Sequence, residues 1–149
     1  MAVKKHYYTQ IREAAISQVK GIVSKTLYRT IESQDPYKTQ TSDLPAIEFR
    51  ISGNDEVDDI GQNYNDVVPI LLTIDVRTQG TAEKGERLFG EVQEALLSDH
   101  TLGGLALVIT PGPVEIDETE NEDRTYVITS GWMILCKVSQ SDPFAVLGA

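Results

Sequence analysis

The sequence predicts an α+β fold with sandwich-like layers: one mixed, mostly antiparallel sheet with two amphipathic helices packed on one face. Two segments repeat apolar residues at helical spacing, whereas five others have the apolar patterns of strands. Most of the strand segments follow one another through polar loops and not through helices, which favours antiparallel pairing. The length of 149 residues, without repeats or low-complexity tracts, predicts a single domain over residues 1–149.

The first helix is expected in "TQIREAAISQVKGIVSK", where apolar residues recur every three or four positions. The segment "TLYRTIES" then alternates apolar and polar residues, which indicates a half-buried strand, and the polar, proline-containing "QDPYKTQTSDLP" indicates a loop. The apolar positions of the helix are Ile11, Ala15, Ile16, Val19, Ile22 and Val23.

Two well-patterned strands follow. In "AIEFRIS", Ile47, Phe49 and Ile51 share one face, and Glu48 and Arg50 share the other. The acidic segment "GNDEVDDIGQNYND" is expected to be a loop. In "VVPILLTIDVRT" every second residue is apolar, and a proline near the strand start is tolerated there. These apolar residues are Val68, Ile70, Leu72, Ile74 and Val76.

The stretch "QGTAEKGER" raises the question of a nucleotide site, because Gly80 and Gly85 are spaced as in a phosphate-binding loop. A Walker loop has Lys and then Ser or Thr after its second glycine, but Glu86 stands there, and no G-x-G-x-x-G pattern is present. A turn at Gly80 and an N-cap at Thr81, with acidic residues in the first turns, explain the stretch as a helix start.

The second helix continues through "AEKGERLFGEVQEALLS", with its apolar face on Leu88, Phe89, Val92 and Leu96, and we expect "TLGGL" to end it in a left-handed cap. "LALVITPGPVEI" is expected to be a strand interrupted by a Pro-Gly-Pro bend, and "DETENED" an acidic loop. The last strand, "RTYVITSGWMILCKV", has one apolar face. Its members are Tyr126, Ile128, Trp132, Ile134, Cys136 and Val138.

Charge is distributed unevenly along the chain. The net charge is −10, yet residues 1–30 hold six basic side chains and one acid, which leaves −15 on the remainder. An acidic chain without a basic stripe is a poor nucleic-acid binder. No apolar run approaches the ~18 residues of a membrane span, and "MAVKKHYYTQ" lacks the apolar core of a secretory signal. With one cysteine and no internal disulfide, we expect a protein of a reducing compartment.

No pattern of catalytic residues is found, so we expect neither an enzyme nor a cofactor. Counted from Asp117, a calcium loop would need Gly and Glu where Glu122 and Ile128 stand. His6 and His100 have no partner at metal-ligand spacing. Cys136 on an apolar strand face is expected to be an inert core residue. We therefore expect no metal site, although carboxylate-rich loops can bind divalent ions loosely.

Taken together, the segments resemble the tail terminator (tail-completion, minor tail protein U-like) family of long-tailed bacteriophages. The resemblance runs from about residue 8 to 143, and its most specific parts are "LPAI", the strand-then-helix at 70–97 and "LGGL". The acidic segment 53–66 has no counterpart in it. The other segments that resemble the family are "IREAAISQVKGIV", "LLTIDVRTQG" and "VITSGWMILCKVSQSDP".

The resemblance implies a structural protein with an α/β fold of this kind that forms a hexameric ring. Such a ring caps the head-proximal end of the tail tube, stops tube polymerisation and presents a surface to the head connector. The implied partners are further copies of the chain, the tail tube protein and the connector, with DNA passing through the lumen without specific binding. The implied location is the virion tail, after assembly in the host cytoplasm. A neck, head-completion or adaptor protein, and a small monomeric ligand-binding domain, remain as alternatives.

A ring requires two different patches that meet head to tail. The basic N-terminal helix and the acidic loops are the candidates for such a pair, and the acidic loops are also candidates for the lumen wall or for a partner-facing surface. The basic interface candidates are Lys4, Lys5, Arg12 and Lys20. The acidic candidates are Asp55, Glu56, Asp58, Asp59, Asp117, Glu118, Glu120, Glu122 and Asp123.

Overall fold

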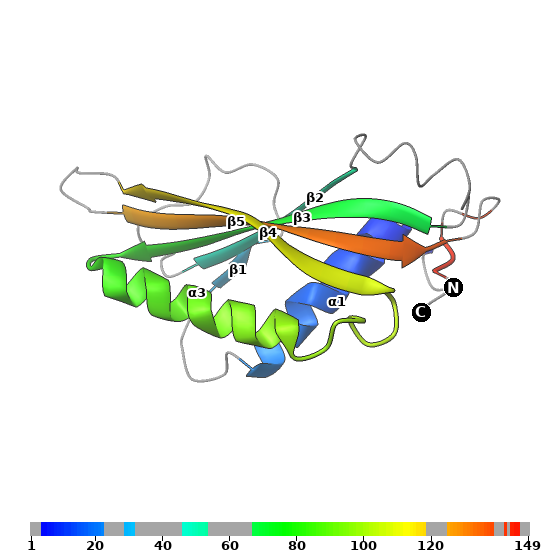
Figure 1. Ribbon diagram of the computed structural model, residues 1–149, viewed down its shortest axis with the longest axis horizontal. Helices are drawn as coiled ribbons and strands as arrows, with labels where there is room; N and C mark the ends of the chain where they lie inside the picture. The colour runs from blue at the N-terminus through cyan, green and yellow to red at the C-terminus, as the bar shows by residue number, and fades with distance from the viewer. Residues whose placement is uncertain are drawn as a thin grey trace.

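The computed structural model describes residues 4–22, 29–31, 46–53, 67–118, 125–138, 142 and 144–146. Two helices and five strands occur in this part of the chain (Figure 1). The helices are α1 (Tyr7–Ile22) and α3 (Ala82–Leu97), and the strands are β1 (Arg29–Ile31), β2 (Ala46–Gly53), β3 (Val67–Gln79), β4 (Val108–Glu118) and β5 (Thr125–Lys137).

All five strands belong to one sheet, in the order β1-β2-β3-β5-β4. The short β1 pairs with β2 in parallel, and every other pair is antiparallel. The predicted mixed, mostly antiparallel sheet of an α+β fold is therefore confirmed. The long strands β3 and β5 pair over their full length at the centre, which leaves β1 and β4 as the two edge strands.

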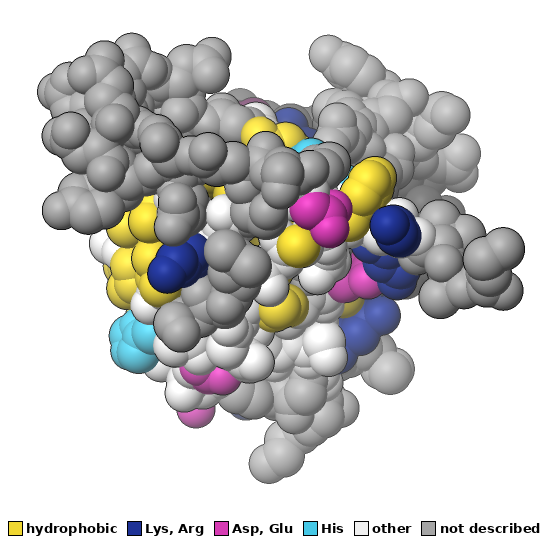
Figure 2. Space-filling model, turned by 90° about the vertical axis from the view of Figure 1, so that its right-hand side faces the viewer, with side chains coloured by type: hydrophobic (Ala, Val, Ile, Leu, Met, Phe, Trp, Pro, Cys, Tyr) yellow, Lys and Arg dark blue, Asp and Glu magenta, His cyan; other side chains and the backbone are white. Residues whose placement is uncertain are grey.

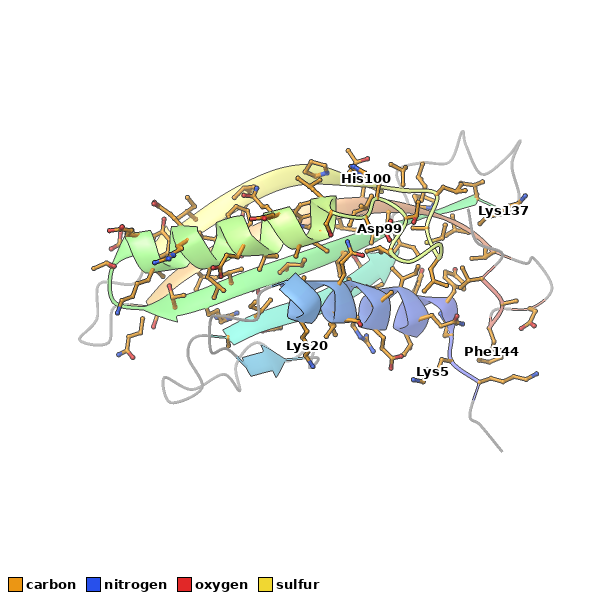
Figure 3. The ribbon with its side chains drawn as sticks, turned by 90° about the horizontal axis from the view of Figure 1, so that it is seen from below. Lys5, Lys20, Asp99, His100, Lys137 and Phe144 are labelled. Carbon is orange, nitrogen blue, oxygen red and sulfur yellow. The ribbon has the colours of Figure 1, made fainter. Side chains whose placement is uncertain are left out.

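The strand register places the predicted apolar faces on the same side of the sheet. Phe49 of β2 lies opposite Ile74 of β3, and Ile74 lies opposite Ser130 of β5. The buried side chains of this side join those of α1 and α3 in one hydrophobic cluster. Figure 3, seen from below, shows both helices in front of the sheet. Each fully buried Ile, Leu or Phe side chain contributes roughly 1.5–3 kcal/mol to stability.

The two helices are also joined by a polar contact. The Gln18 Nε2 atom of α1 donates to the carbonyl oxygens of Ala95 and Leu96, at 2.9 and 3.2 Å, and to that of Asp99 at 3.1 Å. Carbonyl groups in the last turn of a helix have no intrahelical partner. A side chain of α1 therefore satisfies the end of α3 and fixes the position of one helix relative to the other.

Some boundaries differ from the sequence predictions. Helix α3 ends at Leu97 with Ser98 as a right-handed C-cap, so the predicted left-handed cap at "TLGGL" is wrong. Leu102, Gly103 and Gly104 have positive φ angles, in the left-handed region, and they lie in the turn beyond the helix end. Of the predicted first strand, only Arg29–Ile31 is described, and Val23 of the first helix lies outside the described residues.

The predicted Pro-Gly-Pro interruption is present as a β-bulge. Pro111 lies opposite Trp132, yet Val114 lies opposite Ser130, so β4 contains one extra residue between them. A Cβ atom on Gly112 would lie 2.7 Å from the Gly131 carbonyl oxygen, which explains why glycine occupies the bulge. Because the extra residue inverts the alternation, the residues that follow it point to the opposite faces from those an unbroken strand would give them.

Candidate functional site: two oppositely charged edges

The stretch that resembles a phosphate loop is a helix start. Gly80 has a φ of 108°, as the predicted turn requires, and Thr81 is the N-cap residue, although its side chain makes no capping hydrogen bond. Gly85 lies inside α3 and is buried. A Cβ atom at this position would collide with the Tyr126 ring and lie 2.8 Å from Thr78 Oγ1. The second glycine thus permits close packing of helix on sheet.

His6, His100 and Cys136 are the three side chains that could support catalysis or metal binding. Each of them either has a structural role or lies exposed in a turn. His6 Nδ1 accepts a hydrogen bond from the Tyr8 amide at 3.0 Å. His100 lies exposed in the turn after α3. Cys136 is buried in β5, and burial raises the pKa of its thiol to about 12, so it stays protonated at neutral pH. No cluster of three or more potential metal ligands occurs among the residues that the structure describes.

The predicted basic candidates lie along α1 and just before it. Lys4 and Lys20 are exposed, whereas Arg12 is half-buried. Lys5 is already engaged within the chain, because its Nζ atom forms an ion pair with the Glu13 carboxylate at 2.9 Å. In Figure 3 the labelled Lys5 and Lys20 lie on the side of α1 that faces away from α3. Helix α1 packs against β2 and α3, so these charges lie near the β1–β2 edge of the sheet.

The predicted acidic candidates are only partly described. Asp117 and Glu118, expected in a loop, instead form the end of β4, where they lie opposite Val127 and Tyr126. The loop prediction is wrong at these two positions because β4 and β5 continue to pair through them. Both side chains are exposed. Asp55, Glu56, Asp58, Asp59, Glu120, Glu122 and Asp123 lie outside the described residues.

Strand β4 carries features that sequence reasoning missed. From Thr110 onward every residue is exposed, including Val114 at 46% and Ile116 at 59%. Both lie on the helix side of the sheet, opposite Ser130 and Ile128. Helix α3 packs on β3 and β5, and it leaves these two side chains uncovered. The alternation of apolar and acidic residues in "VEIDE", after the Pro-Gly-Pro bend, was the signal in the sequence for this surface. Only the bulge decides on which face of the sheet the apolar residues lie.

The acidic end of β4 adjoins the first turns of α3. The Tyr126 hydroxyl donates to Glu86 Oε1 at 3.5 Å, and Glu118 lies directly opposite Tyr126. Burial, followed by the negative charges of Glu86 and Glu118, raises the pKa of Tyr126. Carboxylates from a strand and from a helix therefore meet at the β4 edge.

A separate group of charges lies on the sheet face opposite the core. Glu48 and Asp75 are directly opposed on β2 and β3, and both are buried. Arg50 Nη2 bonds Asp75 at 3.0 Å, Arg77 Nη2 approaches it at 3.4 Å, and both arginines also pair with Glu48. Two arginines thus neutralise two acids that would otherwise repel each other. The four side chains, two arginines and two acids, form a charge-balanced quartet, which is typical of a structural ion-pair network.

A third surface lies at the end of the molecule that faces the viewer in Figure 2, where hydrophobic side chains are exposed beside Lys and Arg side chains. Near the start of α1 the rings of His6, Tyr7 and Tyr8 contact one another in tilted and edge-to-face arrangements, and Phe144 is 41% exposed. Gln10 Nε2 donates to the carbonyl oxygens of Phe144 and Lys5 at 2.7 and 2.8 Å. The bond to the Phe144 carbonyl holds that residue against α1 (Figure 3).

A scan of protein-family models and a search of curated proteins found no match to this sequence. In the part of the chain that the structure describes, no helix is long and apolar enough to cross a membrane. The site is therefore defined by geometry and charge: a basic helix near one edge of the sheet, and an acidic strand with exposed apolar residues at the other.

Proposed function

We propose that this chain is a structural subunit of a long-tailed bacteriophage, a tail terminator that forms a six-membered ring on the head-proximal end of the tail tube. The ring stops polymerisation of the tube protein and forms the joining surface for the head connector. This role requires no catalysis and no cofactor. The protein would act in the virion tail after assembling in the host cytoplasm.

The observation that carries the proposal is the placement of opposite charges at opposite edges of one sheet. Lys4 and Lys20 belong to the α1 side, and Asp117 and Glu118 to β4. A closed ring larger than a dimer needs two different, complementary patches on each subunit, so that each copy binds the next head to tail. The α+β fold is also of the kind that the sequence resemblance implies.

The proposed ring also has a lumen through which DNA passes. A ring of six copies, each with a net charge of −10, is strongly negative, and DNA passing through it is repelled from the wall. Asp117 and Glu118 lie at a sheet edge and suit a contact with a neighbouring copy. The lumen candidates are therefore the other acidic residues of the two segments, Asp55, Glu56, Asp58, Asp59, Glu120, Glu122 and Asp123.

The test is a capping assay with purified tail tube protein. Tubes polymerised in the presence of the chain should be shorter than tubes grown alone, and electron microscopy should show a ring at one end of each. Serum albumin at the same concentration is the control for crowding and non-specific binding. Tube growth at an unchanged rate to an unchanged length would contradict the proposal.

Two further results of the same preparation would point to the alternatives. Binding to the head connector without any effect on tube growth would indicate a neck or adaptor protein. A chain that is monomeric at every concentration and gains thermal stability from a small molecule would indicate a ligand-binding domain, because only a ligand of the native state raises the melting temperature.

A further inference from the structure

The outer edge of β4 is the open flank of the sheet. β4 is the last strand in the sheet order, and among the described elements none lies beyond it in Figure 3. An edge strand has backbone amide and carbonyl groups that face away from its neighbour, and proteins protect such edges with proline and charge. Here Pro111 and Pro113 protect the first half, whereas Val114–Glu118 contains no proline and carries three carboxylates.

The second half of β4 has two different faces. Val114 and Ile116 are exposed on the helix side, and Glu115 and Asp117 lie on the other side, opposite Thr129 and Val127. Val114 and Ile116 lie on one face of the sheet edge between acidic residues, which makes this stretch a candidate for an interaction surface. The acidic residues restrict the partner, because a surface of the same charge is repelled.

We propose that Val114–Glu118 of β4 is one half of a contact between copies of this chain, and that the other half is the basic outer side of α1 together with the segment just before it, where Lys20 and Lys4 are exposed. The proposal rests on the ring assembly of the proposed function and names the two surfaces that meet in it. Val114 and Ile116 supply the apolar area, and Glu115, Asp117 and Glu118 receive the lysines of the second copy.

Charge selects the second copy's α1 over its β4. Two β4 edges brought together would place three carboxylates opposite three carboxylates, so a symmetric β4–β4 dimer is disfavoured. Lys20 is exposed on the side of α1 that faces away from α3 (Figure 3), and Lys4 is exposed in the segment just before the helix. Because the two halves lie on different flanks of the subunit, the contact repeats from copy to copy and can close into a ring.

Arg12 and Lys5 contribute less than Lys4 and Lys20 to this contact. Arg12 is half-buried, and its Nε atom has no hydrogen-bond partner among the described residues. Lys5 is held by Glu13 and is less available to a second copy. The test variants therefore change Lys4 and Lys20 and leave the other two residues unchanged.

The experiment is a charge swap followed by sedimentation velocity and native mass spectrometry over a concentration series. One variant carries Glu115→Lys and Asp117→Lys, and the other carries Lys4→Glu and Lys20→Glu. In each variant alone both surfaces have the same sign, so self-association should weaken on the order of tenfold or more. In an equimolar mixture every contact again joins opposite signs, so mixed oligomers that alternate the two variants should form.

Single charge reversals elsewhere, each half the charge change of a test variant, are the controls for a general effect of charge. Glu94→Lys on α3 and Lys137→Glu at the end of β5 change exposed charges away from both surfaces, and they should leave association unchanged. Ile116→Ser should weaken association while the far-ultraviolet circular dichroism stays that of the wild type, because the side chain is 59% exposed in the subunit. Raising the salt concentration should weaken the wild-type contact, because exposed charges are screened.

Three results would overturn the inference: a wild type that stays monomeric throughout, charge-reversed variants that associate as the wild type does, or a mixture that fails to recover association. The tail-tube capping assay distinguishes these from a failure of the proposed function. If the wild type caps tubes and the reversed variants still assemble normally, the function stands and this contact is wrong. If the charge swap behaves as expected and tubes are not capped, the contact stands and the terminator role is wrong.

Discussion

Gly85 is a core residue of α3, although glycine in a helix interior is less favourable than alanine by about 1 kcal/mol. Its place opposite Tyr126 and Thr78 explains the choice, because any side chain here would push the helix away from the sheet. Gly90 is in the same helix, but a Cβ atom added there would meet nothing within 4 Å. The two glycines therefore form a matched pair.

Alanine should have opposite effects at these two positions. Gly85→Ala should lower the free energy of unfolding by roughly 1–3 kcal/mol through overpacking, whereas Gly90→Ala should raise it by up to about 1 kcal/mol through helix propensity. Urea denaturation followed by circular dichroism measures both. Equal and positive effects would show that α3 does not approach β5 as closely as the structure has it.

Asp75 supports a different kind of prediction, because it is buried with its charge. Asp75→Asn keeps the shape of the side chain but leaves Arg50 and Arg77 without their closest carboxylate. Because Arg50 and Arg77 are 33% and 19% exposed and keep Glu48 as a partner, the loss should be smaller than for a fully buried ion pair, roughly 1–3 kcal/mol. Thermal unfolding should show this decrease, and the exposed Glu115→Gln should show almost none. A small effect at Asp75 would mean that water reaches the quartet.

At the scale of elements, the turn after α3 is held by Asp99. Its carboxylate accepts hydrogen bonds from the Thr101 hydroxyl at 2.7 Å and from the Thr101 and Gly103 amides at 2.9 Å each. These bonds, led by that of the Thr101 hydroxyl, lower the pKa of Asp99 below its ordinary value of 3.8. The turn thereby leads the chain from α3 into β4, where Leu107 and Val108 join β5.

The lowered pKa makes this stabilisation dependent on pH. A carboxylate that binds its proton less tightly in the folded state contributes stability above its unfolded pKa and loses it as the pH falls through the folded value. The difference in unfolding free energy between the wild type and Asp99→Ala should therefore be largest at neutral pH and shrink below about pH 4. Glu94→Ala removes an exposed charge from α3 as a control. A difference that is constant with pH would contradict the assigned hydrogen bonds.

The β-bulge is the element that makes β4 a candidate contact strand. Without the extra residue, the alternation after Pro111 would put Val114 and Ile116 on the sheet face away from the helices. With it, both apolar side chains lie on the helix side but beyond the area that α3 covers. One inserted residue thus determines the composition of each face of the proposed contact.

At the scale of the whole molecule, the acidic balance of the chain leads to a prediction about DNA passage. In the proposed ring, Asp55→Asn, Glu56→Gln, Asp58→Asn and Asp59→Asn together remove four charges per subunit. The loss should slow DNA ejection, because a less negative wall holds the DNA more strongly. Ejection is followed by the fluorescence of a DNA-binding dye. Glu83→Gln and Glu94→Gln on α3 are the control substitutions and remove two charges per subunit outside this segment. Ejection rates that equal those of the wild type would remove this segment from the lumen.

The sequence by itself determined the local part of this structure. Both helices and the faces of β2, β3 and β5 were predictable from the spacing of apolar residues within one segment, and the helix start at Thr81 from the turn and cap residues around it. Net charge and its division between residues 1–30 and the rest were fixed in the same way. These properties depend on neighbours in the chain, which is why local patterns are sufficient to find them.

Only the tertiary structure decided what depends on segments that are distant in the chain. The insertion of β5 between β3 and β4 makes β4 an edge strand, and it brings Tyr126 against Gly85. The opposition of Glu48 and Asp75 and the exposure of Ile116 likewise depend on strand order, register and the extent of α3. Long-range pairing is selected by the burial of the whole core, and no local pattern encodes which edge of the sheet that core leaves uncovered.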